Sequence, residues 1–338
     1  MRNSNRQWRL KRFPDGMPVA DDWELVENPV AEPGDGEILV RSLYLSVDPY
    51  MRGRISPAKN YAQGVGLGDV MTGGGVGEVI RSNHPDFNAG DIVESFQFGW
   101  QDFPVLQADG TRKVDPDLAP IQSALSYLGL PGLTAYFALL HQAEIQSGET
   151  VLISAASGAV GQVAGQIAKL KGCRPVAIAS SDEKLAWCRE LGYDAGINYR
   201  TTDDLVAAIA DACPTGVDVF FDNTAGPIHD AAMQNLAVKA RVIICGTIAL
   251  ADKFGQPDIG PRFLRQIMVA RAKVEGFLLF DYQEHYDAAR RELAAWHRDG
   301  KLKHREDVAD GLEQTPAAFL RLLNSENFGK QLVKVDEL

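Results

Sequence analysis

The sequence is poor in the residues that build disulfide frameworks and zinc centres. Only four cysteines occur among 338 residues, and they are scattered, with no Cys-x-x-Cys pair and no cluster of histidines. That pattern fits neither a disulfide framework nor a structural zinc site. We therefore expect no bound metal and four reduced, mostly buried thiols, namely Cys173, Cys188, Cys213 and Cys245.

Positive charge is also scarce. The chain has 45 acidic against 34 basic residues, which gives a formal net charge of −11. A protein that binds nucleic acid normally presents a basic face. The one basic run, residues 2–12, is followed at once by acidic residues, so we interpret it as a solvated edge and expect no nucleic-acid partner.

Long apolar runs are absent as well. The longest stretch, residues 124–140, is interrupted by Pro131 and Gly132 and is shorter than the roughly 20 residues that a membrane span needs. No apolar core follows the first basic residues, as a secretory signal would require. We expect a cytoplasmic protein with no membrane partner, in which residues 124–140 are buried core.

The pattern of apolar and polar residues changes near residue 120, and this change predicts two domains. Up to about residue 120, short alternating runs such as residues 36–47 lie between turns and predict a mostly antiparallel β domain. From about residue 125, buried strands alternate with helices, which predicts a parallel sheet covered on both faces. The expected strands are 149–155, 175–180, 196–199, 217–223, 240–246 and 273–280.

The helices between and after these strands complete the prediction. Helices are expected at 160–171, 182–191, 202–213 with Thr202 as a plausible N-cap, about 283–299, and 316–324. A last strand is expected at 330–335. These last elements cannot all join the parallel sheet, so we expect the C-terminus to return to the first domain.

A glycine-rich turn joins the first buried strand to the first helix. It reads Ala156-x-Gly158-x-x-Gly161. In a strand–turn–helix unit, the glycine at 158 lets a pyrophosphate approach the backbone, and the one at 161 lets the helix pack near the strand. The helix N-terminus offers free N–H groups to phosphate oxygens. The alternative is a turn that only packs.

The end of the second strand distinguishes NADP(H) from NAD. An NAD site usually has a carboxylate there, which holds the ribose 2′-hydroxyl. Here Ser180 and Ser181 stand at that place, and Lys184 follows one turn later. Serines can donate to a 2′-phosphate and a lysine can supply charge, so the sequence favours NADP(H). Asp182 is the one nearby carboxylate, and at a helix start it can simply cap.

Several ordered motifs carry a resemblance to a known family. They include "LYLSVDPYMRGR" (43–54), "LGLPGLTAYFALL" (128–140), "AASGAVGQVAGQIAKLKGC" (155–173), "FDNTAG" (221–226), "EGFLLFDY" (275–282) and "ENFGKQ" (326–331). With them the chain resembles the medium-chain dehydrogenase/reductase superfamily. It is most similar to the zinc-free branch of prostaglandin reductases, plant double-bond reductases and bacterial curcumin reductases.

The resemblance implies an α/β fold of two domains with a cleft between them. A GroES-like, mostly antiparallel β domain with the catalytic role would cover 1–125, completed by 302–338, and a Rossmann domain with a doubly wound parallel sheet would bind NADP at 126–301. The implied activity is NADPH-dependent reduction of the carbon–carbon double bond of an α,β-unsaturated ketone or aldehyde, by a homodimer.

The resemblance also implies which residues meet the cofactor. Gly158, Ala159, Val160 and Gly161 would hold the pyrophosphate, and Lys184 and Tyr199 would join Ser180 at the 2′-phosphate. Asn223 would lie along the nicotinamide side. The other cofactor residues would be Cys245, Gly246, Thr247, Phe277, Leu278, Leu279 and Asn327.

The chemistry needs a proton donor as well as a hydride, and a tyrosine hydroxyl suits that task. Tyr61 stands where curcumin-reductase-like members carry a tyrosine important for activity, and Tyr50 is a second candidate, as a donor or a pocket wall. Prostaglandin and plant reductases carry a tyrosine where we align Val269. That absence leaves Tyr61, Tyr50, water or the nicotinamide ribose hydroxyl as the donor.

Other interpretations remain open from the sequence. A quinone reductase of zeta-crystallin type shares the scaffold, and a non-catalytic NADPH-binding protein would keep the cofactor motifs. Tyr50 and Tyr61 can also be packing residues, and Arg52 and Arg54 can be structural. Five aromatic residues suggest that the pocket takes a bulky apolar enone: Tyr50, Tyr61, Phe98, Trp100 and Tyr282.

Overall fold

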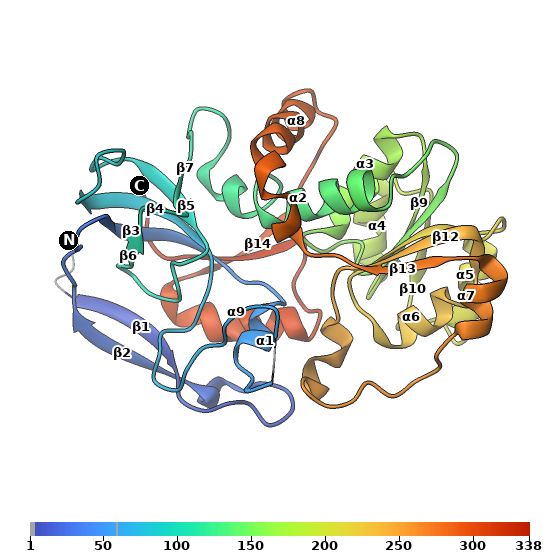
Figure 1. The fold of residues 1–338 in the computed structure, drawn as a ribbon, viewed down its shortest axis with the longest axis horizontal. Helices are drawn as coiled ribbons and strands as arrows, with labels where there is room; N and C mark the ends of the chain where they lie inside the picture. The colour runs from blue at the N-terminus through green and yellow to red at the C-terminus, as the bar shows by residue number, and fades with distance from the viewer. Residues whose placement is uncertain (1–3, 59) are drawn as a thin grey trace. The chain divides into compact units, whose positions relative to one another are not determined.

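The computed structural model describes residues 4–58 and 60–338. The chain divides into two compact units, drawn with their helices and strands in Figure 1. Unit 1 comprises Met1–Ser126, Ala251–Gln256 and Glu306–Leu338, and unit 2 comprises Tyr127–Leu250 and Pro257–Arg305. The sequence did not indicate that the short segment Ala251–Gln256 belongs with the first part of the chain.

Unit 1 is built on a mostly antiparallel seven-stranded sheet. Its order is β14-β15-β3-β4-β5-β7, and β6 pairs with β3. The strands are β3 (Glu37–Ser46), β4 (Gly75–Ser82), β5 (Ile92–Ser95), β6 (Val105–Gln107), β7 (Arg112–Lys113), β14 (Glu306–Asp310) and β15 (Lys330–Lys334). β15 runs antiparallel to β3 with Leu332 opposite Ser46, so two C-terminal strands complete an N-terminal sheet.

A separate two-stranded ribbon and a few short helices complete unit 1. The ribbon pairs β1 (Ser4–Leu10) with β2 (Trp23–Pro29). The helices are η1 (Ala20–Asp22), α1 (Met51–Arg54), η2 (Ile121–Leu125), η6 (Leu312–Gln314) and α9 (Thr315–Leu323). The basic residues of β1 are partly paired: Arg6 donates from Nε to Asp102 at 2.7 Å, which corrects the interpretation of this run as a purely solvated edge.

The core of unit 1 contains two of the aromatic residues expected to line a pocket. Trp100 is fully buried, with its ring 5.6 Å from Trp23 and 5.9 Å from Phe319, and Phe98 is fully buried as well. The prediction that Phe98 and Trp100 line a substrate pocket is therefore wrong. The sequence shows aromatic residues near a turn, but only the packing shows that these two side chains point inward.

Unit 2 is a six-stranded parallel sheet, as predicted. The order is β10-β9-β8-β11-β12-β13. The strands are β8 (Thr150–Ile153), β9 (Arg174–Ala179), β10 (Ala195–Asn198), β11 (Val217–Asp222), β12 (Leu236–Ile244) and β13 (Lys273–Gly276). Strand order reverses between β8 and β11, which is where open sheets of this kind bind ligands.

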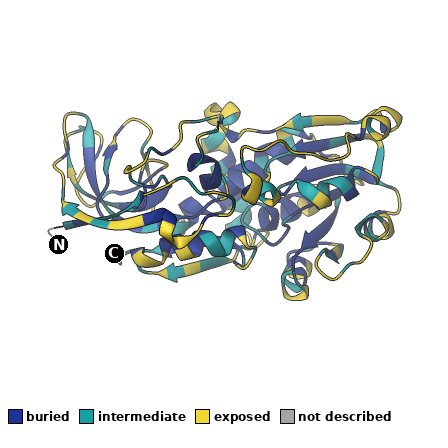
Figure 2. Cartoon of the chain, turned by 90° about the horizontal axis from the view of Figure 1, so that it is seen from below, coloured by how far each residue is buried: buried dark blue, intermediate teal, exposed yellow. Residues whose placement is uncertain are grey.

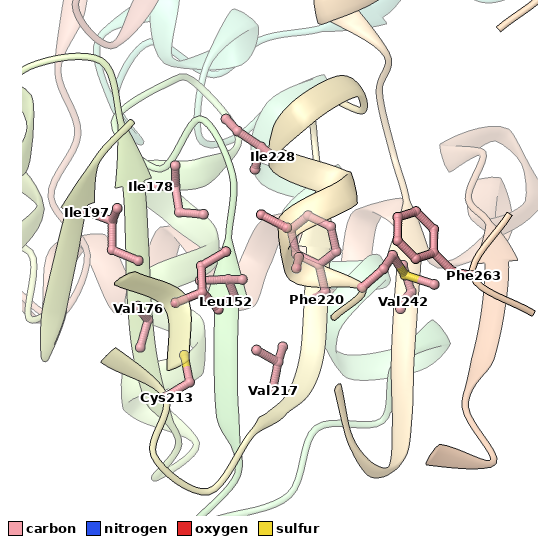
Figure 3. Close-up of a cluster of buried hydrophobic side chains, with 14 residues drawn as sticks. Leu152, Val176, Ile178, Ile197, Cys213, Val217, Phe220, Ile228, Val242 and Phe263 are labelled. Carbon is pink, nitrogen blue, oxygen red and sulfur yellow. The ribbon is translucent and has the colours of Figure 1, made fainter. Parts of the chain in front are cut away.

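Helices cover both faces of this sheet. They are α2 (Leu130–Phe137), η3 (Ala138–Gln142), α3 (Gly161–Leu170), α4 (Asp182–Glu190), α5 (Leu205–Ala212), α6 (Gly226–Ala232), α7 (Leu264–Ala270), η5 (Leu279–His285) and α8 (Tyr286–Arg298). Another 3-10 helix, η4, spans Ile248–Lys253. Figure 3 shows the apolar cluster on one face, where Phe220 and Val242 of the strands meet Ile228 of α6.

The face that carries α3 includes buried polar groups. The side chains of Gln162 and Gln166 are almost fully buried. Gln162 bonds the backbone of Arg305 through both ends of its amide, at 2.9 and 3.1 Å, and Gln166 does the same with Lys303, at 2.8 Å each. These bonds hold the segment 303–305 against the helix that follows the glycine turn.

Three local predictions need correction. The strand expected at 273–280 ends at Gly276, and residues 279–285 form the 3-10 helix η5. Strand β12 begins at Leu236, before the predicted start at residue 240, and ends at Ile244 rather than at residue 246. Thr202 is not the N-cap of α5: Asp204 is, because its Oδ1 accepts from the N–H of Ala207 at 3.0 Å, whereas Thr202 donates its hydroxyl to the carbonyl of Asn198.

The burial pattern agrees with the expectations for the cysteines and for residues 124–140. All four cysteines are free thiols, three of them buried and Cys245 half-buried. Residues 124–140 form part of η2, α2 and η3 and are largely buried, and no helix among the described residues is long and apolar enough to cross a membrane. Figure 2 shows buried residues along the strands of both sheets and exposed ones on loops and outer helix faces.

Candidate functional site

The glycine turn after β8 requires glycine at position 161. A Cβ there would lie 2.4 Å from the carbonyl oxygen of Ala155 and 2.6 Å from the Cα of Ala156. Both are backbone atoms, so they cannot move aside as a flexible side chain would. The hydroxyl of Tyr193 donates to the carbonyl of Gly161 at 2.6 Å and holds the start of α3 in place.

The N-terminus of α3 has donors to offer a phosphate. Its N-cap residue, Val160, makes no side-chain capping bond, and none of the described residues accepts a hydrogen bond from the N–H of Val160 or Gly161. A Cβ at Gly158 would meet only the Ala155 carbonyl, so this side of the turn is open. Free backbone donors at the positive end of a helix fit a pyrophosphate, and the turn passes this test for NADP(H).

The ends of β9 and β10 bring the three predicted 2′-phosphate residues together. Asn198 lies opposite Ala179 in the sheet, and the N–H of Tyr199 donates to the carbonyl of Ala179 at 3.2 Å. Lys184 reaches back from α4, with its Nζ 3.2 Å from the hydroxyl of Ser180. An ammonium and a hydroxyl at one strand end are a donor set for a phosphate.

The role of Asp182 is corrected at this place. Ser181, not Asp182, caps α4, because its hydroxyl accepts from the N–H of Lys184 at 3.2 Å. Asp182 instead accepts from the side-chain amide of Asn198 at 2.9 Å. Asn198 was missed from the sequence, although its place just before Tyr199 was the signal that could have found it.

The ends of β11 and β12 carry the residues expected on the nicotinamide side. The backbone carbonyl of Asp222 accepts from the N–H groups of Cys245 at 2.8 Å and Gly246 at 3.1 Å. Asn223 donates from its side-chain amide to the carbonyl of Ser154 at 2.8 Å. Burial, with the nearby Asp222, raises the pKa of Cys245 to about 12, so this thiol stays neutral. The sequence did not predict a role for Asp222, because no short motif assigns a function to its side chain.

Phe277 follows β13 and lies beside Tyr282. The N–H of Phe277 donates to the carbonyl of Ile244 at 3.0 Å, and its buried ring stacks on Tyr282 at 5.6 Å. Leu279 is buried, and Leu278 is 39% exposed. Tyr282 donates its hydroxyl to Gln142 at 2.7 Å, so that hydroxyl already has a protein acceptor.

The two candidate catalytic tyrosines lie around one guanidinium in unit 1. The Arg54 Cζ is 5.5 Å from the ring centre of Tyr50 and 4.9 Å from that of Tyr61. Tyr50 is half-buried, whereas Tyr61 is 52% exposed. Burial, and then the charge of Asp48, raise the pKa of Tyr50 well above its ordinary value, so this phenol stays protonated.

A buried ion pair holds the turn that presents Tyr50. Lys330 Nζ donates to Asp48 Oδ1 and to the carbonyl of Val47, at 2.8 Å each, and its side chain is 1% exposed. The other oxygen of Asp48 accepts from the hydroxyl of Ser46. This pair connects two motifs that are distant in the sequence, "VDPY" and "NFGK".

Three other predicted positions are placed as follows. Asn327 is buried, and its amide donates to the carbonyl of Gly329 at 2.9 Å, closing its own loop. Val269 is 59% exposed on α7 and carries no proton donor. Arg52 donates to the carbonyls of Ala251 and Gly16 and lies over the ring of Phe254, which explains why Ala251–Gln256 belongs to unit 1.

The described residues contain no group of three or more His, Cys, Asp or Glu side chains that could hold a metal ion. The chain combines an antiparallel β unit with a six-stranded parallel unit that has donors for a pyrophosphate and a 2′-phosphate. These features define a dinucleotide-dependent oxidoreductase. Residues 6–114 match the model of an N-terminal domain of oxidoreductase, and residues 159–295 match that of a zinc-binding dehydrogenase.

Individual proteins are similar along the whole chain. YfmJ of Bacillus subtilis is 44% identical over 340 residues, covering 100% of this chain and 99% of its own. The NADPH-dependent curcumin reductase of Escherichia coli is 39% identical over 336 residues, covering 98% and 97%. The crystal structure of CurA in complex with NADPH from Vibrio vulnificus has a TM-score of 0.93 at 38% identity, covering 98% and 100%.

The chain therefore belongs to the medium-chain dehydrogenase/reductase family.

Proposed function

We propose that the protein reduces the carbon–carbon double bond of α,β-unsaturated ketones and aldehydes with NADPH. The observation that carries the proposal is the tyrosine pair: Tyr50 and Tyr61 place two phenols on the guanidinium of Arg54. Such a reduction needs a proton donor, and the tyrosine pair supplies two candidates. The relatives of this chain include an NADPH-dependent curcumin reductase.

The cofactor residues divide by the part of NADPH that they bind. The turn Gly158, Ala159, Val160 and Gly161 binds the pyrophosphate, with the backbone N–H groups of Val160 and Gly161 as donors, because the N–H of Gly158 already donates to the carbonyl of Ala155. Ser180, Lys184 and Tyr199 bind the 2′-phosphate. Bound NADPH supplies the hydride that the β-carbon receives. The residues that line the remaining cofactor are Asn223, Cys245, Gly246, Thr247, Phe277, Leu278, Leu279 and Asn327.

The chain's own part in the chemistry is to stabilise the enolate oxygen and to protonate the α-carbon. Tyr61 is the better donor, because its exposure lets it recover the proton from solvent. The guanidinium of Arg54 at 4.9 Å stabilises the phenolate that this transfer leaves. Tyr50 is the poorer donor, since burial raises its pKa, and it serves as a wall that orients the substrate.

The deciding experiment follows NADPH absorbance with a panel of enones and enals, and runs NADH, quinones and saturated alcohols alongside. We expect enone-dependent NADPH loss with recovery of the saturated carbonyl product. Turnover of quinones alone would support the quinone-reductase alternative, and tight NADPH binding with no turnover would support a binding protein. A panel in which small polar enals alone react would reject a bulky apolar substrate.

Tyr61→Phe and Tyr50→Phe then identify the proton donor, because each removes one hydroxyl and keeps the ring over Arg54. We expect Tyr61→Phe to lower kcat by about 10²-fold or more, the usual size of a general-acid contribution. Tyr50→Phe should mainly raise the KM for the enone. Equal kcat in wild type and Tyr61→Phe would show that Tyr61 is not the proton donor, and would leave Tyr50, water or the ribose hydroxyl as the donor.

A homodimer and a cytoplasmic location complete the proposal. The edge strand β13 offers unpaired backbone groups beside half-exposed Val274, and such an edge can pair with a second copy across a two-fold axis. Of the segment "GFLLF", only Gly276 belongs to this edge strand, and residues 277–280 follow it. Sedimentation velocity at micromolar concentration tests the dimer, and a monomer would reject it.

A further inference from the structure

A fully buried carboxylate lies at the carboxyl end of β11. Asp222 is 0% exposed, and its Oδ1 accepts from the N–H of Thr224 and of Ala225 at 2.9 Å each, and from the hydroxyls of Ser154 at 3.2 Å and Thr224 at 3.3 Å. Its Oδ2 lies 2.9 Å from Nδ1 of His229 on α6. Burying an ionised carboxylate is costly unless hydrogen bonds and a partner charge compensate it, and here both are present.

The same residue organises two loops that the proposed function assigns to the cofactor. The hydroxyl of Ser154, held by Asp222, also accepts from the N–H of Asn223 at 2.8 Å. The main-chain carbonyl of Asp222 holds Cys245 and Gly246. Asp222 thus joins the ends of β8, β11 and β12, at the strand ends where a parallel sheet binds its ligand.

The turn that Asp222 holds contains a strained residue. Ala225 has φ 58° and ψ −156°, a backbone conformation that essentially only glycine adopts. Such strain persists only where the surroundings impose it, and it clusters at functional sites. The bond from the Ala225 N–H to the Asp222 carboxylate imposes it here, so the carboxylate holds a turn that would otherwise relax.

His229 supplies the charge that offsets Asp222. Its ring lies 6.1 Å from the rings of Phe220 and Phe263, and the charged groups that act on it are all carboxylates: Asp222 on β11, Asp230 on α6, and Asp258. The bond to Asp222 raises the pKa of His229 above its ordinary 6.5, against the opposing effect of burial.

We propose that the Asp222–His229 pair is a positioning device for the nicotinamide half of NADPH: its carboxylate holds the turn 223–226 directly, and by fixing the end of β11 it also fixes the backbone carbonyl that holds the loop at Cys245 and Gly246. This inference rests on the proposed function, because it takes those loops as cofactor-binding. Both residues act through the loops and neither touches the reacting atoms, so the pair should set NADPH affinity more than kcat.

The test measures the dissociation constant of NADPH by fluorescence between pH 6 and pH 9, together with KM for NADPH and kcat. In the wild type, NADPH affinity should fall about tenfold as pH rises through the pKa of His229, because deprotonation removes the charge from the hydrogen bond between His229 and the carboxylate that holds the turn. His229→Gln keeps a polar side chain without the titration. Its affinity should be weaker by about tenfold at pH 6 and should show no such step, with kcat within about twofold.

Two further variants keep the test decisive. Asp222→Asn keeps an acceptor for the turn and removes the charge that raises the pKa of His229, so the step should move to lower pH even if His229→Gln folds poorly. His84→Gln is the matched control, because His84 belongs to a loose surface pair with Asp86 at 4.0 Å, and it should behave as the wild type. The 2′-phosphate of NADPH also titrates near pH 6, but identically in every variant.

The outcomes separate this inference from the proposed function. Wild-type affinity and pH profile in both His229→Gln and Asp222→Asn would overturn the inference, even if enones are reduced. If no enone is turned over but the step in NADPH affinity disappears with His229→Gln, the proposed function fails and the positioning role stands.

Discussion

His304 makes unit 2 sensitive to acid. Its ring centre lies 4.4 Å from that of Tyr127, with the two rings tilted by 39°, and 5.2 Å from that of His297. Burial, together with His297, lowers the pKa of His304 from 6.5 to about 4. Between these two values the unfolded chain binds a proton that the folded chain does not. Stability is therefore unaffected above about pH 6.5, falls as pH drops, and reaches its full loss below about pH 4.

The size of this loss follows from the shift. The pKa of His304 is 6.5 in the unfolded chain and about 4 in the folded chain. At about 1.4 kcal/mol per pKa unit, this difference corresponds to about 3 kcal/mol of unfolding free energy. His304→Phe keeps an aromatic ring in the stack and removes the titration. Between pH 7 and pH 4, the wild type should lose about 3 kcal/mol more than His304→Phe.

Urea unfolding followed by both tryptophan fluorescence and far-UV circular dichroism measures this difference. The two probes must coincide for the free energies to be comparable, because the chain has two units. His229 titrates with the opposite sign, stabilising the fold at low pH, but it does so in both proteins and cancels. Exposed His285→Phe should follow the wild type. The same dependence of unfolding free energy on pH in the wild type and His304→Phe would refute the argument.

Three further predictions concern single side chains. Lys330→Met should cost about 3–5 kcal/mol of stability, because it leaves the carboxylate of Asp48 buried without its partner; urea unfolding measures it. Gly161→Ala should destabilise the protein by about 1–3 kcal/mol and weaken NADPH binding at least tenfold, since the new Cβ would meet backbone atoms at 2.4 Å; calorimetry measures both. Lys184→Ala should raise the KM for NADPH about tenfold and leave that for NADH unchanged, as the loss of one charge-assisted bond to the 2′-phosphate implies; steady-state kinetics measures it.

Each of these has a matched control. Lys334→Met lies on the same strand as Lys330 but pairs with exposed Glu337, so its stability should not change measurably. A Cβ at Gly276 meets nothing within 4 Å, so Gly276→Ala should keep wild-type stability. Equal losses of unfolding free energy in Lys330→Met and Lys334→Met would contradict the argument for the buried ion pair. Wild-type stability and NADPH affinity in Gly161→Ala would contradict the argument for the glycine turn. An equal rise of the KM for NADH in Lys184→Ala would contradict the assignment of Lys184 to the 2′-phosphate.

Patterns that depend on neighbouring residues were predictable. The parallel sheet of unit 2 follows from apolar runs that alternate with amphipathic helices, and the strand–turn–helix at Gly158 and Gly161 needs only local geometry. Ser180 and Lys184 were predictable as a pair because four residues make one helical turn. The errors at 273–280 and at Thr202 are also local: an apolar run does not show where a strand stops, and two acceptors near one helix start compete to cap it.

By itself, the sequence determined the order of strands and helices, the family motifs and the chemical nature of the dinucleotide site, because each depends on residues a few positions apart. The tertiary structure alone decided which side chains face one another. Lys330 meets Asp48 across 282 positions, and the carboxylate of Asp222 meets both Ser154 after β8 and His229 on α6. Phe98 and Trp100 turned out to be core for the same reason. Alternation along a strand divides side chains between two faces, but only the packing of distant segments determines which face is buried.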